Sequence, residues 1–76
     1  MKAQELIDRG FISKGISGEF IISQDKTTII VILGRYEQIE IYTDGRMQEA
    51  HPIDHVRHVD EICYIHGFRY KIPSNE

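Results

Sequence analysis

The sequence is poor in the features that would reveal a function directly. Its 76 residues include one cysteine, two prolines and no tryptophan. The single cysteine, Cys63, excludes a disulfide within the chain and is compatible with a reducing compartment. No apolar run approaches the roughly 18 residues of a membrane span, and the first residues lack the apolar core of a signal peptide. We therefore expect a cytoplasmic protein that does not bind membranes.

Basic residues are too few for a protein that holds nucleic acid by charge alone. Nine lysines and arginines stand against 12 aspartates and glutamates, which gives a formal net charge of −3 with histidine neutral. Domains that neutralise phosphates usually carry a clear basic excess. The six glycines are scattered and form neither a P-loop nor a dinucleotide-binding fingerprint. We expect no cofactor.

Isoleucine is abundant, with 14 residues against three valines and two leucines. A β-branched Cβ packs well on a pleated sheet, so this bias favours strands. In the aliphatic run at 28–33, Ile29 and Val31 would point one way while Ile30 and Ile32 point the other. Because both faces are apolar, a helix or a second subunit must cover the side that does not face the core. Ile30 and Ile32 are therefore candidates for self-association in a homo-oligomer.

The remaining pattern predicts a single domain over residues 1–76. Good helix formers that end at a glycine predict a short helix at 2–9. A short extended piece and a turn are expected at 11–18, and a frayed tail at 73–76. Strands are expected at 19–23, 28–33 and 36–43.

Register distinguishes two forms of the turn around Gly45. A two-residue loop would place Glu40 opposite Glu49, a pair of like charges. A three-residue loop with Gly45 in the left-handed region would place Ile41 opposite Met47 instead. We favour the three-residue loop because its pairs are mutually compatible.

The last third of the sequence predicts a helical turn followed by a second hairpin. Ile53, Val56 and Val59 recur every third residue after Pro52, which is typical of a single helical or 3₁₀ turn. A second hairpin would then turn at 66–67. Its core-facing side would carry Cys63, Ile65, Phe68 and Tyr70.

This order of strands, helical turn and final strand, over about 11–60, resembles a small SH3-like barrel. An Sm-like barrel also opens with a helix and is the nearest rival, although a clear Sm motif is missing. The predicted fold is mainly β: a small SH3-like barrel or a strongly bent antiparallel sheet of five or six strands, with a short N-terminal helix.

Histidines are the strongest candidates for metal chemistry. On one helix, His51, His55 and His58 would share a face, a set suited to a first-row transition metal. Proline and β-branched residues oppose such a helix, and structural zinc sites show tighter paired spacings, so we expect no metal. A pH-sensing role for the histidines is left open. Cys63 and His66 would lie on opposite faces of a strand, and Cys63 is interpreted as a buried small hydrophobe, so no enzyme is expected.

Aromatic and basic side chains are the candidates for partner contact. Such a set suits protein interfaces, where tyrosine and arginine act as anchors, and also single-stranded nucleic acid. The acidic net charge favours a protein partner. The sequence predicts a non-enzymatic interaction or regulatory module, of a size typical of a bacterial or phage accessory factor that modulates a larger host machine. A small barrel that binds single-stranded DNA or RNA is the alternative. The partner-binding candidates are Tyr36, Tyr42, Arg46, Tyr64, Arg69 and Lys71.

Overall fold

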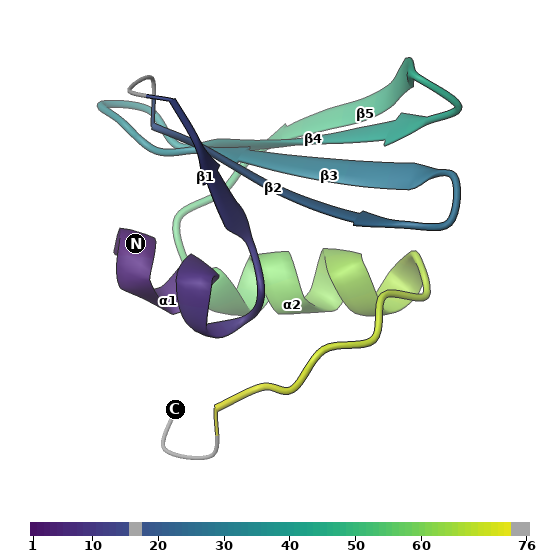
Figure 1. Cartoon of the computed structure of the whole chain (residues 1–76). Helices are drawn as coiled ribbons and strands as arrows, with labels where there is room; N and C mark the ends of the chain where they lie inside the picture. The colour runs from purple at the N-terminus through teal and green to yellow at the C-terminus, as the bar shows by residue number, and fades with distance from the viewer. Residues whose placement is uncertain (16–17, 74–76) are drawn as a thin grey trace.

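The structure is a computed structural model that describes residues 1–15 and 18–73. Within these residues, a five-stranded antiparallel sheet forms one layer and two helices form the other (Figure 1). The strands lie in chain order, so each pairs with the next. The elements are α1 (Ala3–Asp8), β1 (Ile12–Lys14), β2 (Glu19–Gln24), β3 (Thr27–Ile32), β4 (Gln38–Thr43), β5 (Arg46–Pro52) and α2 (Val56–Ile65).

The mainly β fold with a short N-terminal helix is confirmed. Of the two predicted forms, a small barrel and a bent antiparallel sheet, the structure shows the open sheet. In the described chain it ends at β1 on one side and at β5 on the other. The predicted second hairpin is wrong, because its first strand is the helix α2. After α2 the chain runs as an extended tail along the helix layer (Figure 1). Most of the predicted frayed tail, residues 74–76, and part of the predicted turn, residues 16–17, lie outside the described residues.

Both helices end in the same hydrogen-bonded motif. At the end of α1, Phe11 N–H donates to the Leu6 carbonyl (3.0 Å) around Gly10, which has a φ of 98°. At the end of α2, Phe68 N–H donates to the Cys63 carbonyl (2.8 Å) after a glycine with a φ of 78°. This is the Schellman motif, in which glycine takes the left-handed conformation and the following apolar residue packs back on the helix. Both phenylalanines are buried, so each motif anchors its helix in the core.

The hydrophobic core lies between the sheet and the helices. The inner face of the sheet supplies Ile29 and Val31 from β3, and Ile39 and Ile41 from β4, all without exposed surface. Burial of each such aliphatic side chain contributes about 1.5–3 kcal/mol. The two helices, the loops and β2 complete the cluster with Leu6, Phe11, Phe20, Ile53, Val59, Cys63 and Phe68.

The β4–β5 hairpin differs from both predicted registers. Thr43 pairs with Arg46, so the loop has two residues rather than the three that were predicted. A bulge then shifts the register, and Glu40 pairs with Ala50 instead of with Glu49. The irregularity that separates Glu40 from Glu49 therefore lies inside the strand and not in the turn. The bulge also turns Glu49 to the helix side of the sheet, since Glu49 pairs with the buried Ile41.

Candidate interaction surface

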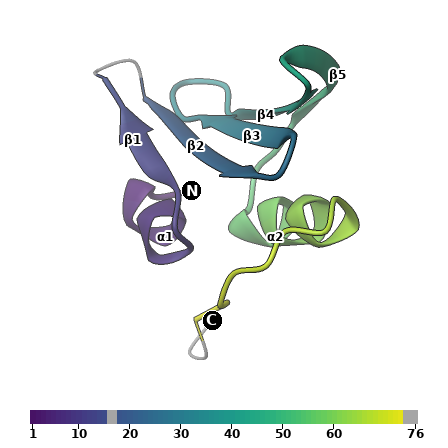
Figure 2. The same cartoon turned by 45° about the vertical axis from the view of Figure 1, so that its right-hand side comes forward.

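The face of the sheet turned away from the helices carries an aliphatic row. The residues of β3 alternate, so Ile30 lies on this side while Ile29 is buried on the other. The register places Ile12 beside Ile21 and Ile21 beside Ile30, so the row crosses three strands. Ile12 is 73 % exposed, and a shallow depression of about 450 Å³ lies along β1 and β2 beside the row. Both helices lie on the opposite side of the sheet (Figures 1 and 2).

We call this side the open face. Three of its polar members lie on β4, where Glu40 follows Ile30 in the same row. The Glu40 carboxylate accepts hydrogen bonds from Gln38 Nε2 (3.0 Å) and from the Tyr42 hydroxyl (3.1 Å), one on each oxygen. The bond to Glu40 raises the pKa of Tyr42. A fixed carboxylate therefore borders the aliphatic row. The open face comprises Ile12, Lys14, Glu19, Ile21, Ser23, Thr28, Ile30, Ile32, Gln38, Glu40, Tyr42, Met47, Ala50 and Pro52.

The predicted self-association residues both lie on the open face. Ile30 and Ile32 are half-buried by their neighbours in the sheet. They lie on β3, the central strand, on the side opposite the buried Ile29 and Val31. Self-association itself stays a prediction.

The six predicted partner-binding residues do not form one surface. Tyr42 lies on the open face, whereas Tyr64 is 82 % exposed on α2, in the other layer. Tyr36 is 81 % exposed in the β3–β4 loop, where the Arg35 guanidinium lies 5.7 Å from its ring centre. The remaining three are exposed at the start of β5 and on the tail: Arg46, Arg69 and Lys71.

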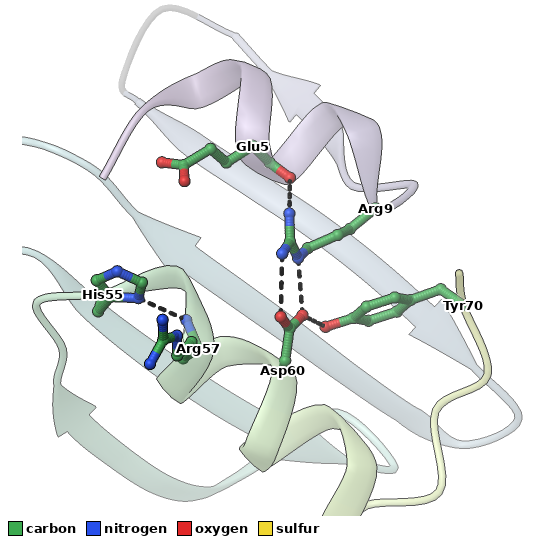
Figure 3. Close-up of polar contacts among 6 residues, drawn as sticks. All are labelled: Glu5, Arg9, His55, Arg57, Asp60 and Tyr70. Atoms are coloured by element: carbon green, nitrogen blue, oxygen red, sulfur yellow. Dashed lines mark hydrogen bonds and ion pairs between the residues drawn. The ribbon is translucent and has the colours of Figure 1, made fainter. Parts of the chain in front are cut away.

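The three histidines considered for a metal lie on three different parts of the chain. His51 is on β5, His55 caps α2 and His58 is inside α2. The His55 Nδ1 atom accepts from the Arg57 backbone N–H at 3.1 Å (Figure 3), and His58 Nδ1 lies 3.3 Å from Asp54 Oδ1. Within residues 1–15 and 18–73, no group of three His, Cys, Asp or Glu side chains is placed to hold a metal ion.

Glu49 joins two histidines that the sequence did not bring together. Its Oε1 lies 3.0 Å from His51 Nε2, and its Oε2 lies 3.3 Å from His66 Nε2. The hydrogen bond with His51 holds the pKa of Glu49 below its usual value. Because His66 follows the last turn of α2, this contact ties β5 to the helix layer. Only the bulge in β5 gives Glu49 this orientation, and nothing in the sequence alone marks the bulge.

A buried ion pair joins α1, α2 and the tail (Figure 3). The Arg9 side chain has no exposed surface, and its guanidinium donates to the two carboxylate oxygens of Asp60 at 2.7 and 3.0 Å. Arg9 Nη1 also donates to the Glu5 carbonyl at 3.0 Å, and the Tyr70 hydroxyl donates to Asp60. These contacts connect residues 51 positions apart, so they fix the two helices relative to each other.

Cys63 lies next to this ion pair and is buried. The residue is 1 % exposed, and burial raises the pKa of its thiol to about 11. Burial and the hydrogen bond to Asp60 likewise raise the pKa of Tyr70 far above its usual value. A thiol that stays protonated at neutral pH is a poor nucleophile. The cluster of Arg9, Asp60, Tyr70 and Cys63 therefore holds the two helices and the tail together.

Comparisons of the chain with known protein families, with curated proteins and with solved structures find no match. None of the helices in the described ranges is both long and apolar enough to cross a membrane.

Proposed function

We propose that this chain is a non-enzymatic interaction module that binds another protein, and that the open face is its contact surface. The observation that carries the proposal is the row of isoleucines across β1, β2 and β3, which lies on the side of the sheet away from both helices and ends in the exposed Ile12. Apolar patches with polar rims mark protein interaction sites on soluble domains. A sheet with two apolar faces is typical of a central layer, which has a further layer on each side.

A protein partner is favoured over single-stranded nucleic acid by the charges on the open face. Nucleic-acid grooves combine cations that follow the phosphates with aromatic side chains that stack on bases. Here Tyr42 is held by Glu40, and a carboxylate at this position would repel a phosphate. The predicted basic residues lie away from this face, at the start of β5 and on the tail.

The proposed role is that of an accessory factor of bacterial or phage origin, which acts in the cytoplasm on a larger machine. The buried, protonated thiol of Cys63 supports a role without covalent catalysis. The exposed Tyr36, Tyr64, Arg69 and Lys71 remain candidates for further contacts with such a machine.

Affinity capture with matched variants tests the proposal. Tagged chain is used to retrieve proteins from an extract of the native host, and the retained proteins are identified by mass spectrometry. Ile30→Lys places a charge in the centre of the open face, while Ile65→Lys makes the same change on α2, at a side chain that is 76 % exposed. Circular dichroism verifies that each variant folds. If Ile30→Lys does not fold, Ile12→Lys replaces it as the open-face variant.

A defined partner that binds the wild type and Ile65→Lys, but not Ile30→Lys, would support the proposal. A partner that binds Ile30→Lys as well as it binds the wild type would contradict it. Salt-dependent retention of single-stranded DNA or RNA would favour the alternative function.

A further inference from the structure

The outer edge of β5 is a second candidate surface, apart from the isoleucine row of the open face. β5 is the last strand of the sheet, and all seven of its residues are exposed. Within residues 1–15 and 18–73, no strand pairs with this edge. We propose that β5 pairs in antiparallel fashion with β5 of a second copy of the chain, about a two-fold axis at Ala50. The two sheets then continue as one, with both helix layers on the same side.

The backbone of β5 offers hydrogen-bonding groups to such a partner. Ile53 N–H donates to the Glu37 carbonyl (3.1 Å), and this pair continues the register of β4 and β5. Hydrogen-bonded and non-bonded pairs alternate along an antiparallel ladder. Ala50, three residues before Ile53, therefore directs its N–H and C=O away from β4. Pro52 agrees with this phase, because proline in a sheet is confined to positions where the missing N–H would face outwards.

Charge decides which residue lies on the two-fold axis. Glu49 and His51 lie on the helix side of β5, where they pair with inward-facing residues of β4. An axis at Glu49 would set two carboxylates opposite each other, and an axis at His51 would oppose two imidazoles. An axis at Ala50 instead sets Glu49 of each copy opposite His51 of the other. The bulge before Glu49 excludes a regular ladder nearer the turn.

Glu49 can serve both copies at once. Its two oxygens already contact His51 and His66 of its own chain at 3.0 and 3.3 Å. A carboxylate has about four acceptor sites, so it can take a further hydrogen bond from the second copy. An imidazole N–H donates to a carboxylate whether or not the ring is charged. The axis at Ala50 therefore gives a complementary set of side chains beside the paired backbones.

α2 supplies an apolar contact on the same side of the molecule. Asp60 faces Arg9 on α1, and α1 lies beneath the β1 end of the sheet (Figures 2 and 3). With about 100° per residue, Ile62 and Ile65 lie about 160° and 140° from Asp60 around α2. They are therefore on the side of α2 away from α1. Ile65 is 76 % exposed, and Ile62 is half-buried.

The contact between Glu49 and His66 places the last turn of α2 beneath β5, next to the proposed axis. Because a two-fold axis perpendicular to the sheet keeps the helices in one layer, the two α2 helices run antiparallel on either side of it. Ile62 and Ile65 of both copies then meet below the joined strands. The pairing thus gives a role to the exposed Ile65, which the single chain leaves in solvent.

The size of this contact fits a weak dimer. Five facing residues of about 3.4 Å each, above a helix about 10 Å across, give a contact roughly 17 Å long and 20 Å deep. Two such contacts total less than the roughly 1,200 Å² of stable complexes and match weak, transient ones. We expect a dissociation constant on the order of 0.1 mM.

Sedimentation equilibrium over a concentration series up to about 1 mM tests the proposal. The wild type is expected to pass from one copy towards two. Ala50→Pro removes the outward N–H without a hydrogen bond to β4, and Ile65→Lys places a charge in the helix contact. Each is expected to raise the dissociation constant at least about tenfold. The control Tyr64→Lys changes an 82 % exposed residue on the α1 side of α2 and should follow the wild-type curve. Circular dichroism verifies that the variants fold.

A disulfide locates the axis. The Cα atoms of a hydrogen-bonded antiparallel pair are about 5.5 Å apart, within the span of a disulfide. Ala50→Cys is therefore expected to link two copies under mild oxidation. Lys14→Cys places a thiol on β1, the other edge strand, and should link far more slowly. Cys63 is only 1 % exposed, so it does not compete.

Three outcomes would overturn the inference. One is a wild type that stays a single copy throughout the series. Another is a dimer that both Ala50→Pro and Ile65→Lys leave at wild-type strength, and the third is Ala50→Cys linking no faster than Lys14→Cys. The isoleucine row on β1, β2 and β3 takes no part in this contact, so these outcomes leave the proposed function of the open face standing.

Discussion

Replacement of Asp60 by asparagine is expected to lower the free energy of unfolding by about 3–5 kcal/mol. The carboxylate faces a guanidinium whose side chain has no exposed surface, and Asp60 itself is only 12 % exposed. Loss of the negative charge takes from the buried Arg9 guanidinium the carboxylate that accepts two of its hydrogen bonds, and weaker compensation of a buried charge is costly. A 76-residue domain has a total stability of about 4–11 kcal/mol, so the variant should be close to unfolding at room temperature.

Urea unfolding followed by circular dichroism measures this loss. Glu61→Gln removes a carboxylate from the next position of α2, where the residue is exposed, and should change the stability by less than about 0.5 kcal/mol. The double variant Arg9→Met with Asp60→Leu should recover most of the loss, because an apolar pair of similar volume replaces both charges. An Asp60→Asn protein within about 1 kcal/mol of the wild type would refute the reasoning.

Three further predictions concern pH and backbone conformation. Because burial raises the pKa of Cys63 from 9.0 to about 11, the stability that the protonated thiol supplies should be lost as pH rises from 9 to 11. Cys63→Ala should remove this loss in urea unfolding at alkaline pH. The lowered pKa of Glu49 stabilises the fold above about 4.5, and this stabilisation is lost as pH falls through the lowered value, so Glu49→Gln should weaken acid sensitivity in the same assay. Gly67→Ala should cost about 1 kcal/mol because its φ is 78°, while Gly34→Ala, at a glycine without positive φ, should cost less in thermal unfolding.

The strands were predictable because their side-chain pattern is local. The segments that form β2 and β3 are short apolar runs rich in β-branched residues, and the segment that forms β4 alternates with period two; both signals predict strands. The inference that one face of β3 would need cover also follows from alternation alone. Which side the helices take depends on packing of the whole chain, and local alternation carries no information on it.

The sequence predicted a single helical turn up to Val59 but not the rest of α2, because the signals that follow are ambiguous. His66-Gly67 suits a hairpin loop, but glycine with positive φ equally ends a helix, and here it does so. Val56, Val59 and Cys63 have the spacing of a helix face, and all three are buried. A glycine followed by phenylalanine occurs at 10–11 and again at 67–68, and the first pair was already interpreted as a helix end. Comparison of the two pairs would have favoured the helix.

Long-range contacts were beyond sequence reasoning. Arg9 and Asp60 are 51 positions apart, and many other pairs of opposite charges in the chain were equally plausible. The contact between Glu49 and His66 depends on a bulge that inserts one residue into β5. The like-charge conflict between Glu40 and Glu49 did signal an irregularity in this hairpin. The charge pattern did not determine that this irregularity lies in the strand rather than in the turn.

Isoleucine methyl NMR tests most directly whether the open face is a contact surface. The chain is labelled at its isoleucine δ1-methyl groups, and spectra are recorded as a captured partner is added. The account predicts that open-face signals shift while signals from the inner core stay in place. Shifts confined to core or helix-layer isoleucines, or open-face signals that remain unchanged, would contradict it. The open-face reporters are Ile12, Ile21, Ile30 and Ile32, and the core controls are Ile29, Ile39 and Ile41.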